Sequence, residues 1–201
     1  MTGKGSAANE SWYEKKVGDY SVPVDFLTDA PPHTQGTPTV DDIVASVLPG
    51  INRALLTART MKVTASDLAG TSTTATLRVC EVGPFLALKL RAFLHRQQAK
   101  DAFDILYTLL HYDRGTAAAL AAFAEELRAQ NTVCPDALLC LQRHFDSEAS
   151  LGPAKAAQFF PGPATPNEPA DIRFQRLQIQ QEMVNAAGLL IAGVSGHGGR
   201  Q

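Results

Sequence analysis

Three basic residues are spaced along one apolar run of the chain, residues 83–112. Lys89 and Arg96 are seven positions apart, and Lys100 follows four positions later. On a continuous helix of 3.6 residues per turn, the second and third of these residues fall within about 20° of the first. Lysine and arginine supply charge-assisted hydrogen-bond donors, so a stripe of this kind is typical of a grip on a phosphate chain.

Two acidic residues follow in the string K-D-x-x-D, which is formed by Lys100, Asp101 and Asp104. A second interpretation therefore stays open, in which the charges lie on a solvated face and form local pairs. One such pair, Lys100 with Asp104 at i,i+4, would contribute about 0.3–0.5 kcal/mol. Lys89 favours a more specific role, because it lies inside the apolar string FLALKL. A lysine in that position must reach a partner or water.

Asp25 is the candidate metal ligand. It lies near the end of the apolar, alternating run YSVPVDFL, where a carboxylate can hold a divalent ion while cations hold the phosphates. The alternative is a strand-end acid that accepts backbone hydrogen bonds. His95 and His111 lack metal-ligand spacing, and a structural role is also favoured for the three cysteines, Cys80, Cys134 and Cys140.

The composition excludes some classes of protein. A chain of 201 residues with 45% hydrophobic content is long enough for one domain with a real core, or for one domain with a helical extension. The net charge of −2 provides no general attraction to nucleic acid or membrane. The N-terminus lacks the apolar segment of a signal peptide, and the apolar run 186–194 is too short to span a bilayer. We therefore expect a soluble, cytoplasmic protein without membrane contact.

The elements that position these residues follow a simple order, strands first and helices after. Residues 1–16 and 195–201 are expected to be a disordered head and tail, residues 17–82 a small sheet region and residues 83–194 a helical region. This order predicts an α+β fold, with a C-terminal helical bundle after a partial sheet. The expected strands are 20–27, 60–64 and 75–82, a short helix is expected to run from the cap at 41–42 to about 48, and a further short turn is expected at 52–57. Longer helices are expected at 84–96, 98–112, 116–130, 135–145, 154–159 and 171–193.

The run GPFLALKLRAFLHRQQAKDAFDILYTLL resembles a known motif, K-x-x-A-x-x-x-R-x-x-x-K/R-D-x-x-D. This motif belongs to the AbiEii/AbiGii-type nucleotidyltransferases, the toxin-like branch of the DNA polymerase β-type superfamily. The upstream string VPVDFLTD is similar to the family's strand that carries the third active-site acid. The order of elements around LPGINRALLTARTMKV also resembles the family, and the resemblance covers roughly residues 18–113.

The resemblance implies an enzyme that binds a nucleoside triphosphate with Mg²⁺ and transfers a nucleotidyl group. It implies an antitoxin as protein partner and tRNA as a candidate acceptor. Asp25 would be the metal-site acid, and the phosphate contacts would come from Lys89, Arg96 and Lys100. The catalytic set implied in this way is Asp25, Lys89, Asp101 and Asp104.

One family motif is missing upstream of Asp25. The family has a Gly-Gly or Gly-Ser turn followed by D-x-D on a strand, and no D-x-D precedes Asp25 in this sequence. Two-metal catalysis needs carboxylates on both sides of the reacting phosphate. The sequence therefore predicts a truncated or degenerate member with weak or no transfer activity. The alternative is a non-catalytic module that binds a nucleotide or a protein. Its open sheet edge would pair with another chain.

Overall fold

A β-hairpin begins the part of the chain that the structure describes. The structure is a computed structural model, and it describes residues 12–30, 36, 38–40, 42–67, 69–159 and 161–195. Strand β1 (Trp12–Val17) pairs with β2 (Tyr20–Asp25) in antiparallel register, and Gly18 turns the chain at a φ of 59°. Residues 12–16 were expected to be disordered, and that expectation is wrong, because alternating residues here pair with the apolar strand that follows. Residues 1–11 and the tail 196–201 lie outside the described residues.

Two short strand pairs follow the hairpin. Strand β3 (Leu27–Thr28) pairs in parallel with β6 (Ser46–Val47), and β4 (Thr39–Val40) pairs antiparallel with β5 (Ile43–Val44). The helix predicted to end near residue 48 is therefore wrong. Asp42 adopts a φ of 65° in the turn between β4 and β5, a conformation that aspartate tolerates. The β-branched residues that follow it prefer strands.

A buried carboxylate, Asp29, holds the start of the first helix, α1 (Ile51–Leu56). Asp29 is only 8% exposed. It accepts hydrogen bonds from the backbone N–H of Gly50 at 2.9 Å and from that of Asn52 at 2.7 Å. These donors have no partner within a helix, so Asp29 caps α1 from a distant part of the chain.

A long hairpin closes the N-terminal unit, which comprises residues 1–81. Strand β7 (Arg59–Ser66) pairs with β8 (Ser72–Val79) in antiparallel register, and both strands are exposed along their whole length. The strand predicted at 60–64 lies within β7. The strand predicted at 75–82 begins and ends three residues earlier as β8, because Val82 already belongs to the next helix.

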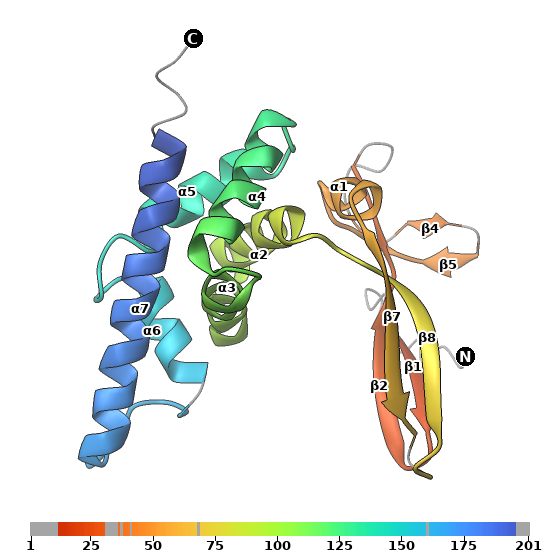
Figure 1. Cartoon of the computed structure of the whole chain (residues 1–201), viewed down its shortest axis with the longest axis horizontal. Helices are drawn as coiled ribbons and strands as arrows, with labels where there is room; N and C mark the ends of the chain where they lie inside the picture. Colours follow the sequence, from red (N-terminus) through yellow and green to blue (C-terminus); the bar gives the residue numbers. More distant parts are fainter. Residues whose placement is uncertain are drawn as a thin grey trace. The chain divides into compact units, whose positions relative to one another are not determined.

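Six helices lie in the described part of the C-terminal unit, which comprises residues 82–201 (Figure 1). They are α2 (Val82–Arg96), α3 (Ala99–His111), α4 (Thr116–Arg128), α5 (Cys134–His144), α6 (Leu151–Phe159) and α7 (Ala170–Ser195). The predicted α+β fold is confirmed. No helix among the described residues is long and apolar enough to cross a membrane.

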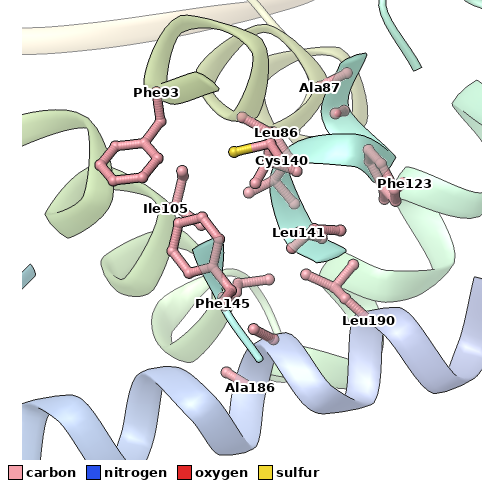
Figure 2. Packing of buried hydrophobic residues seen from close by; sticks show 14 of the residues in the cluster. Leu86, Ala87, Phe93, Ile105, Phe123, Cys140, Leu141, Phe145, Ala186 and Leu190 are labelled. Atoms are coloured by element: carbon pink, nitrogen blue, oxygen red, sulfur yellow. The ribbon is translucent and has the colours of Figure 1, made fainter. Parts of the chain in front are cut away.

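All six of these helices contribute buried residues to the core of the helical unit. Figure 2 shows part of this core, including Phe93, Phe123 and Leu190. Helix α2 lies at its centre and packs against α3, α4 and α5. Two glycines permit close approaches: a Cβ at Gly83 would lie 2.4 Å from the Ala122 carbonyl oxygen, and one at Gly152 would lie 2.2 Å from the Phe145 ring. Side chains with no more than 1% exposure include Leu86, Leu90, Phe93, Ile105, Leu109, Phe123, Leu141, Phe145 and Leu190.

Candidate functional site

The two helices that carry the candidate residues are separated by a sharp break at Gln97. Helix α2 ends at Arg96, Gln97 adopts a left-handed φ of 52°, and α3 begins at Ala99 after an extended Gln98. The two separate helices predicted at 84–96 and 98–112 are confirmed to within two residues, and the three cations do not share the stripe of one continuous helix. The break turns α3 back against α2, so residues that were expected in a line instead meet across a corner.

Lys89 is the centre of this corner. Its Nζ lies 2.7 Å from Asp104 Oδ2 and 3.2 Å from Asp101 Oδ1. It also lies 5.7 Å from the centre of the Phe85 ring, within the range of a cation–π contact. The sequence required a partner for a lysine among apolar residues, and the structure provides two carboxylates from the first turns of α3.

Two further cations complete a five-residue group, which we call the Lys89 cluster. Arg96 binds Asp101 through two parallel hydrogen bonds, from Nε at 2.6 Å and from Nη2 at 2.7 Å. Lys100 Nζ lies 2.7 Å from the same Asp104 oxygen that Lys89 contacts. Three cations and two carboxylates give the cluster a formal charge of 3 − 2 = +1. It therefore has more hydrogen-bond donors than its own acids use.

Burial divides the Lys89 cluster into an inner and an outer part. The Asp101 side chain is 1% exposed and the Lys89 side chain 20% exposed, whereas Arg96 and Lys100 are 59% and 65% exposed. Asp101 is fixed in place because its neighbours Ala102 and Ile105 are fully buried in the core. The inner carboxylate thus belongs to the scaffold, and the outer cations face water.

The electrostatics of the cluster keep both acids ionised. Burial alone would raise the pKa of Asp101, but hydrogen bonds from Arg96 and Lys89 outweigh it, and the pKa lies below its ordinary value. Burial acts on Asp104 in the same direction and is likewise outweighed, by hydrogen bonds from Lys100 and Lys89, so its pKa is also lowered. The hydrogen bond to Asp101 raises the pKa of Arg96. The two carboxylates and the Arg96 guanidinium are therefore charged at neutral pH.

Asp25 belongs to the other unit. It is the last residue of β2, it is exposed, and its backbone pairs with that of Trp12. Residues Lys89, Arg96, Lys100, Asp101 and Asp104 form one group within the C-terminal unit, and Asp25 is not part of that group. Across the described residues, no three histidine, cysteine or acidic side chains gather closely enough to hold a metal ion.

The remaining candidates from the sequence have structural surroundings. His95 Nε2 lies 3.6 Å from Asp136 on α5, and the His111 ring lies 4.6 Å from that of Tyr107. Burial raises the pKa of Cys140 to about 12, which keeps its thiol protonated. The sequence analysis did not find the Phe85 contact with Lys89, although a spacing of four residues on one helix was a usable signal.

The geometry defines a charged, partly solvent-accessible cluster on the helical unit of an α+β protein. A family model described as the nucleotidyl transferase AbiEii toxin of a type IV toxin–antitoxin system matches residues 20–183. This match spans most of the chain and includes the whole Lys89 cluster and Asp25. The chain belongs to the AbiEii nucleotidyl transferase toxin family. Comparison with curated proteins and with solved structures gave no match.

Proposed function

We propose that the Lys89 cluster is the triphosphate-binding part of a nucleotidyltransferase site. In this role Lys89, Arg96 and Lys100 contact the phosphates of a nucleoside triphosphate. Asp101 is a positioning residue, which holds Arg96 and Lys89 at fixed points. The observation that carries the proposal is the bidentate pair between Arg96, 59% exposed, and Asp101, 1% exposed. It presents an orientated guanidinium to solvent.

The donors that remain on the outer cations suit a phosphate. Arg96 uses Nε and Nη2 on Asp101, so the other N–H groups of the guanidinium are left over for a second anion. Lys100 shares one oxygen of Asp104 with Lys89, and an ammonium has three donors. A triphosphate can therefore bind without removing the internal carboxylates. It would also compensate the excess positive charge of the cluster.

Asp25 is proposed as the acid that holds Mg²⁺. Magnesium is usually bound by one or two carboxylates together with substrate phosphates and water, so a single exposed aspartate fits the ion only when the triphosphate is present. When bound, Mg²⁺ would neutralise charge that develops on the transferred phosphoryl group. With one candidate acid, we propose that this chain transfers nucleotides weakly or not at all. We also propose an antitoxin as its protein partner.

Binding is tested by the thermal stability of the full chain with and without a nucleoside triphosphate. Each lost contact to a charged phosphate should weaken binding by roughly ten- to a hundredfold, so Arg96→Gln and Lys100→Gln should both reduce the stabilisation by ligand. Arg128→Gln is the matched control, because Arg128 is 58% exposed on α4 and pairs with Glu125 outside the cluster. Equal stabilisation of all four proteins would contradict the proposed phosphate grip.

The metal is tested in the same assay by adding and omitting Mg²⁺. Asp25→Asn should abolish the additional stabilisation that Mg²⁺ gives and should leave binding of the metal-free triphosphate unchanged. If Mg²⁺ acts equally on the wild type and on this variant, the assignment of Asp25 is wrong, whereas the phosphate contacts of Arg96 and Lys100 are judged separately by the preceding experiment.

A second function, binding without transfer, is favoured by one observation. Each of the three cations already has a carboxylate partner within 3.2 Å, as a stable binding module would require. Incorporation of labelled nucleotide into tRNA or protein in the presence of Mg²⁺ separates the two functions. We expect little incorporation, and any that occurs should vanish in Asp25→Ala. Efficient incorporation would contradict the proposed weak or absent activity. Weak incorporation that Asp25→Ala abolishes would identify a transferase, and nucleotide binding with no incorporation would identify a binding module.

A further inference from the structure

Four aromatic rings form a row on the helical unit, and three of them belong to α3. The ring centre of Phe103 lies 4.8 Å from that of Phe159 on α6 and 6.2 Å from that of Tyr107. The ring centre of Tyr107 lies in turn 4.6 Å from that of His111. Tyr107 is 57% exposed and Phe159 is 43% exposed, and His111 is also exposed. We call these four residues the α3 aromatic row.

The row continues a stripe of α3 that begins in the Lys89 cluster. The members of this stripe follow one another at intervals of 4, 3 and 4 residues and are Lys100, Asp104, Tyr107 and His111. They lie within about 60° of one another around the helix, and none of them is buried. About 10 Å of helix separates Lys100 from Tyr107. One surface of α3 therefore carries a cation at its N-terminal end and aromatic rings at its C-terminal end.

We propose that the α3 aromatic row binds the base of the nucleoside triphosphate whose phosphates the Lys89 cluster holds. The inference rests on the proposed function and adds a site for the other end of the same ligand. A nucleotide has an anionic end and a flat aromatic end, joined by a sugar. The stripe of α3 offers complementary groups in the same order, because the cluster has a formal charge of +1 and the rings follow it along the helix.

The contacts within the row prepare Tyr107 to receive a base. Phe103 is half-buried and contacts both Phe159 and Tyr107, so it supports the more exposed ring. A tyrosine has only two χ angles, and a ring that is already supported loses little further freedom when a ligand binds. Stacking on an aromatic ring tolerates every base, because every base has a π-face. The site should therefore bind nucleoside triphosphates with little selection among their bases.

The position of the cations favours a mononucleotide over a strand of nucleic acid. Proteins that bind single strands combine stacking rings with a positively charged groove that follows the backbone. Lys100 is the only lysine or arginine of α3, and it lies in the first turn of the helix. Lys89 and Arg96 gather at the same end, because both contact Asp101. Phosphates would therefore be bound at one end of the rings and not along them.

The test is isothermal titration calorimetry of the full chain with ATP, CTP, inorganic triphosphate and a single-stranded oligoadenylate. Tyr107→Ala should weaken the binding of ATP and CTP at least about fivefold, the lower limit for the loss of one stacked base. The same variant should bind inorganic triphosphate as the wild type does. Tyr107→Trp should retain the affinity for ATP, because an indole also stacks on a base. ATP should quench the fluorescence of the added indole and inorganic triphosphate should not, with the wild type and its one tryptophan, Trp12, as background.

The control is Phe174→Ala, which removes an aromatic ring that is 70% exposed on α7 and should leave all four affinities unchanged. Far-UV circular dichroism verifies that each variant is folded. If Tyr107→Ala has no effect while Arg96→Gln weakens ATP, CTP and inorganic triphosphate alike, the base site is wrong and the phosphate grip stands. An equal loss for inorganic triphosphate in Tyr107→Ala would also overturn the base site, and so would a loss confined to the oligoadenylate. A wild type that binds neither ATP nor inorganic triphosphate would overturn the base site and the proposed function together.

Discussion

Replacing Asp101 by asparagine is the sharpest test of the Lys89 cluster as a structural unit. The substitution preserves the shape of the side chain but removes its charge. The formal charge of the cluster then rises from 3 − 2 = +1 to 3 − 1 = +2. Asp101 is 1% exposed and accepts three hydrogen bonds from cations, at 2.6, 2.7 and 3.2 Å. Asparagine has one side-chain oxygen, which can accept only some of these three hydrogen bonds. Its NH₂ group would lie against a cation and cannot accept a hydrogen bond from it.

The expected loss of stability depends on which interactions Arg96 and Lys89 can form once the charge of Asp101 is removed. Removing one partner of a fully buried ion pair costs about 3–5 kcal/mol. Here Arg96 is 59% exposed and regains water, and Lys89 keeps Asp104 at 2.7 Å. The loss should therefore be close to that of one buried hydrogen bond to a charged group, about 1.5–3 kcal/mol.

Urea unfolding followed by far-UV circular dichroism measures this loss for the helical unit. The control is Glu125→Gln, which disrupts an exposed pair between side chains that are 63% and 58% exposed and should change the stability by less than about 0.5 kcal/mol. If Asp101→Asn and the control have equal effects, the buried carboxylate does not hold the corner between α2 and α3, and the division into inner and outer parts is refuted.

The same pair of proteins has a defined pH dependence. The pKa of Asp101 in the folded protein lies below its ordinary value of 3.8. A lowered pKa stabilises the fold above the ordinary value, and that stabilisation is lost as the pH falls through the folded-state value. The difference between wild type and Asp101→Asn should therefore be constant near neutral pH and should shrink below about pH 4. A difference that grows on acidification would show that the carboxylate is protonated in the folded protein.

Three further predictions concern other parts of the chain. Gly152→Ala should cost about 1–3 kcal/mol in urea unfolding, because its Cβ would lie 2.2 Å from the Phe145 ring; unchanged stability would mean that the ring moves freely. Asp29→Ala should accelerate hydrogen exchange at the start of α1 and cost about 0.5–2 kcal/mol, since two backbone amides lose their acceptor. Cys140, with a pKa of about 12, should resist alkylation in the native protein at about pH 8 and react after unfolding, as mass spectrometry would reveal.

The long helices could be predicted because their ends carry strong local signals. The helix expected at 116–130 is observed as Thr116–Arg128, directly after Gly115. The helix expected at 135–145 is observed as Cys134–His144, with Pro135 in its first turn. The apolar periodicity of each helix and the Gly or Pro that marks its boundary lie within a few residues of each other. Helix bounds of this kind can therefore be predicted without knowledge of tertiary contacts.

The short strands could not be predicted for the opposite reason. Asp42 is equally suited to cap a helix and to occupy the left-handed position of a turn. A helix through residue 48 would also have to include Ser46, which instead pairs with Leu27, 19 positions earlier in the chain. The contacts of Asp29 also join residues far apart in the sequence. Its carboxylate oxygens accept hydrogen bonds from N–H groups 21 and 23 residues further along the chain. Contacts at such separations leave no periodic trace in the sequence.

The site illustrates both cases at once. Its residues could be predicted from spacing and from the family motif, but their pairing could not, because it depends on Gln97. A helix boundary between residues 96 and 98 was predicted, but a left-handed glutamine is uncommon, and no glycine or proline indicates the direction in which the chain turns there. With a continuous helix, Arg96 and Asp101 would be five residues apart and on different faces. The break makes them a bidentate pair.

The same break decides against a fully solvated face, whereas the specific grip on a phosphate stays a proposal. A solvated face would leave every charge exposed, but Asp101 is 1% exposed and holds cations that are 20% and 59% exposed. Lys100 and Asp104, in contrast, form the local i,i+4 pair expected of a surface. The inner pair should therefore govern stability and the outer cations should govern ligand binding. Substitution at Lys100 should reduce ligand binding with little loss of stability, whereas substitution at Asp101 should reduce both, because Asp101 also positions Arg96; one undivided cluster would lose both properties at either position.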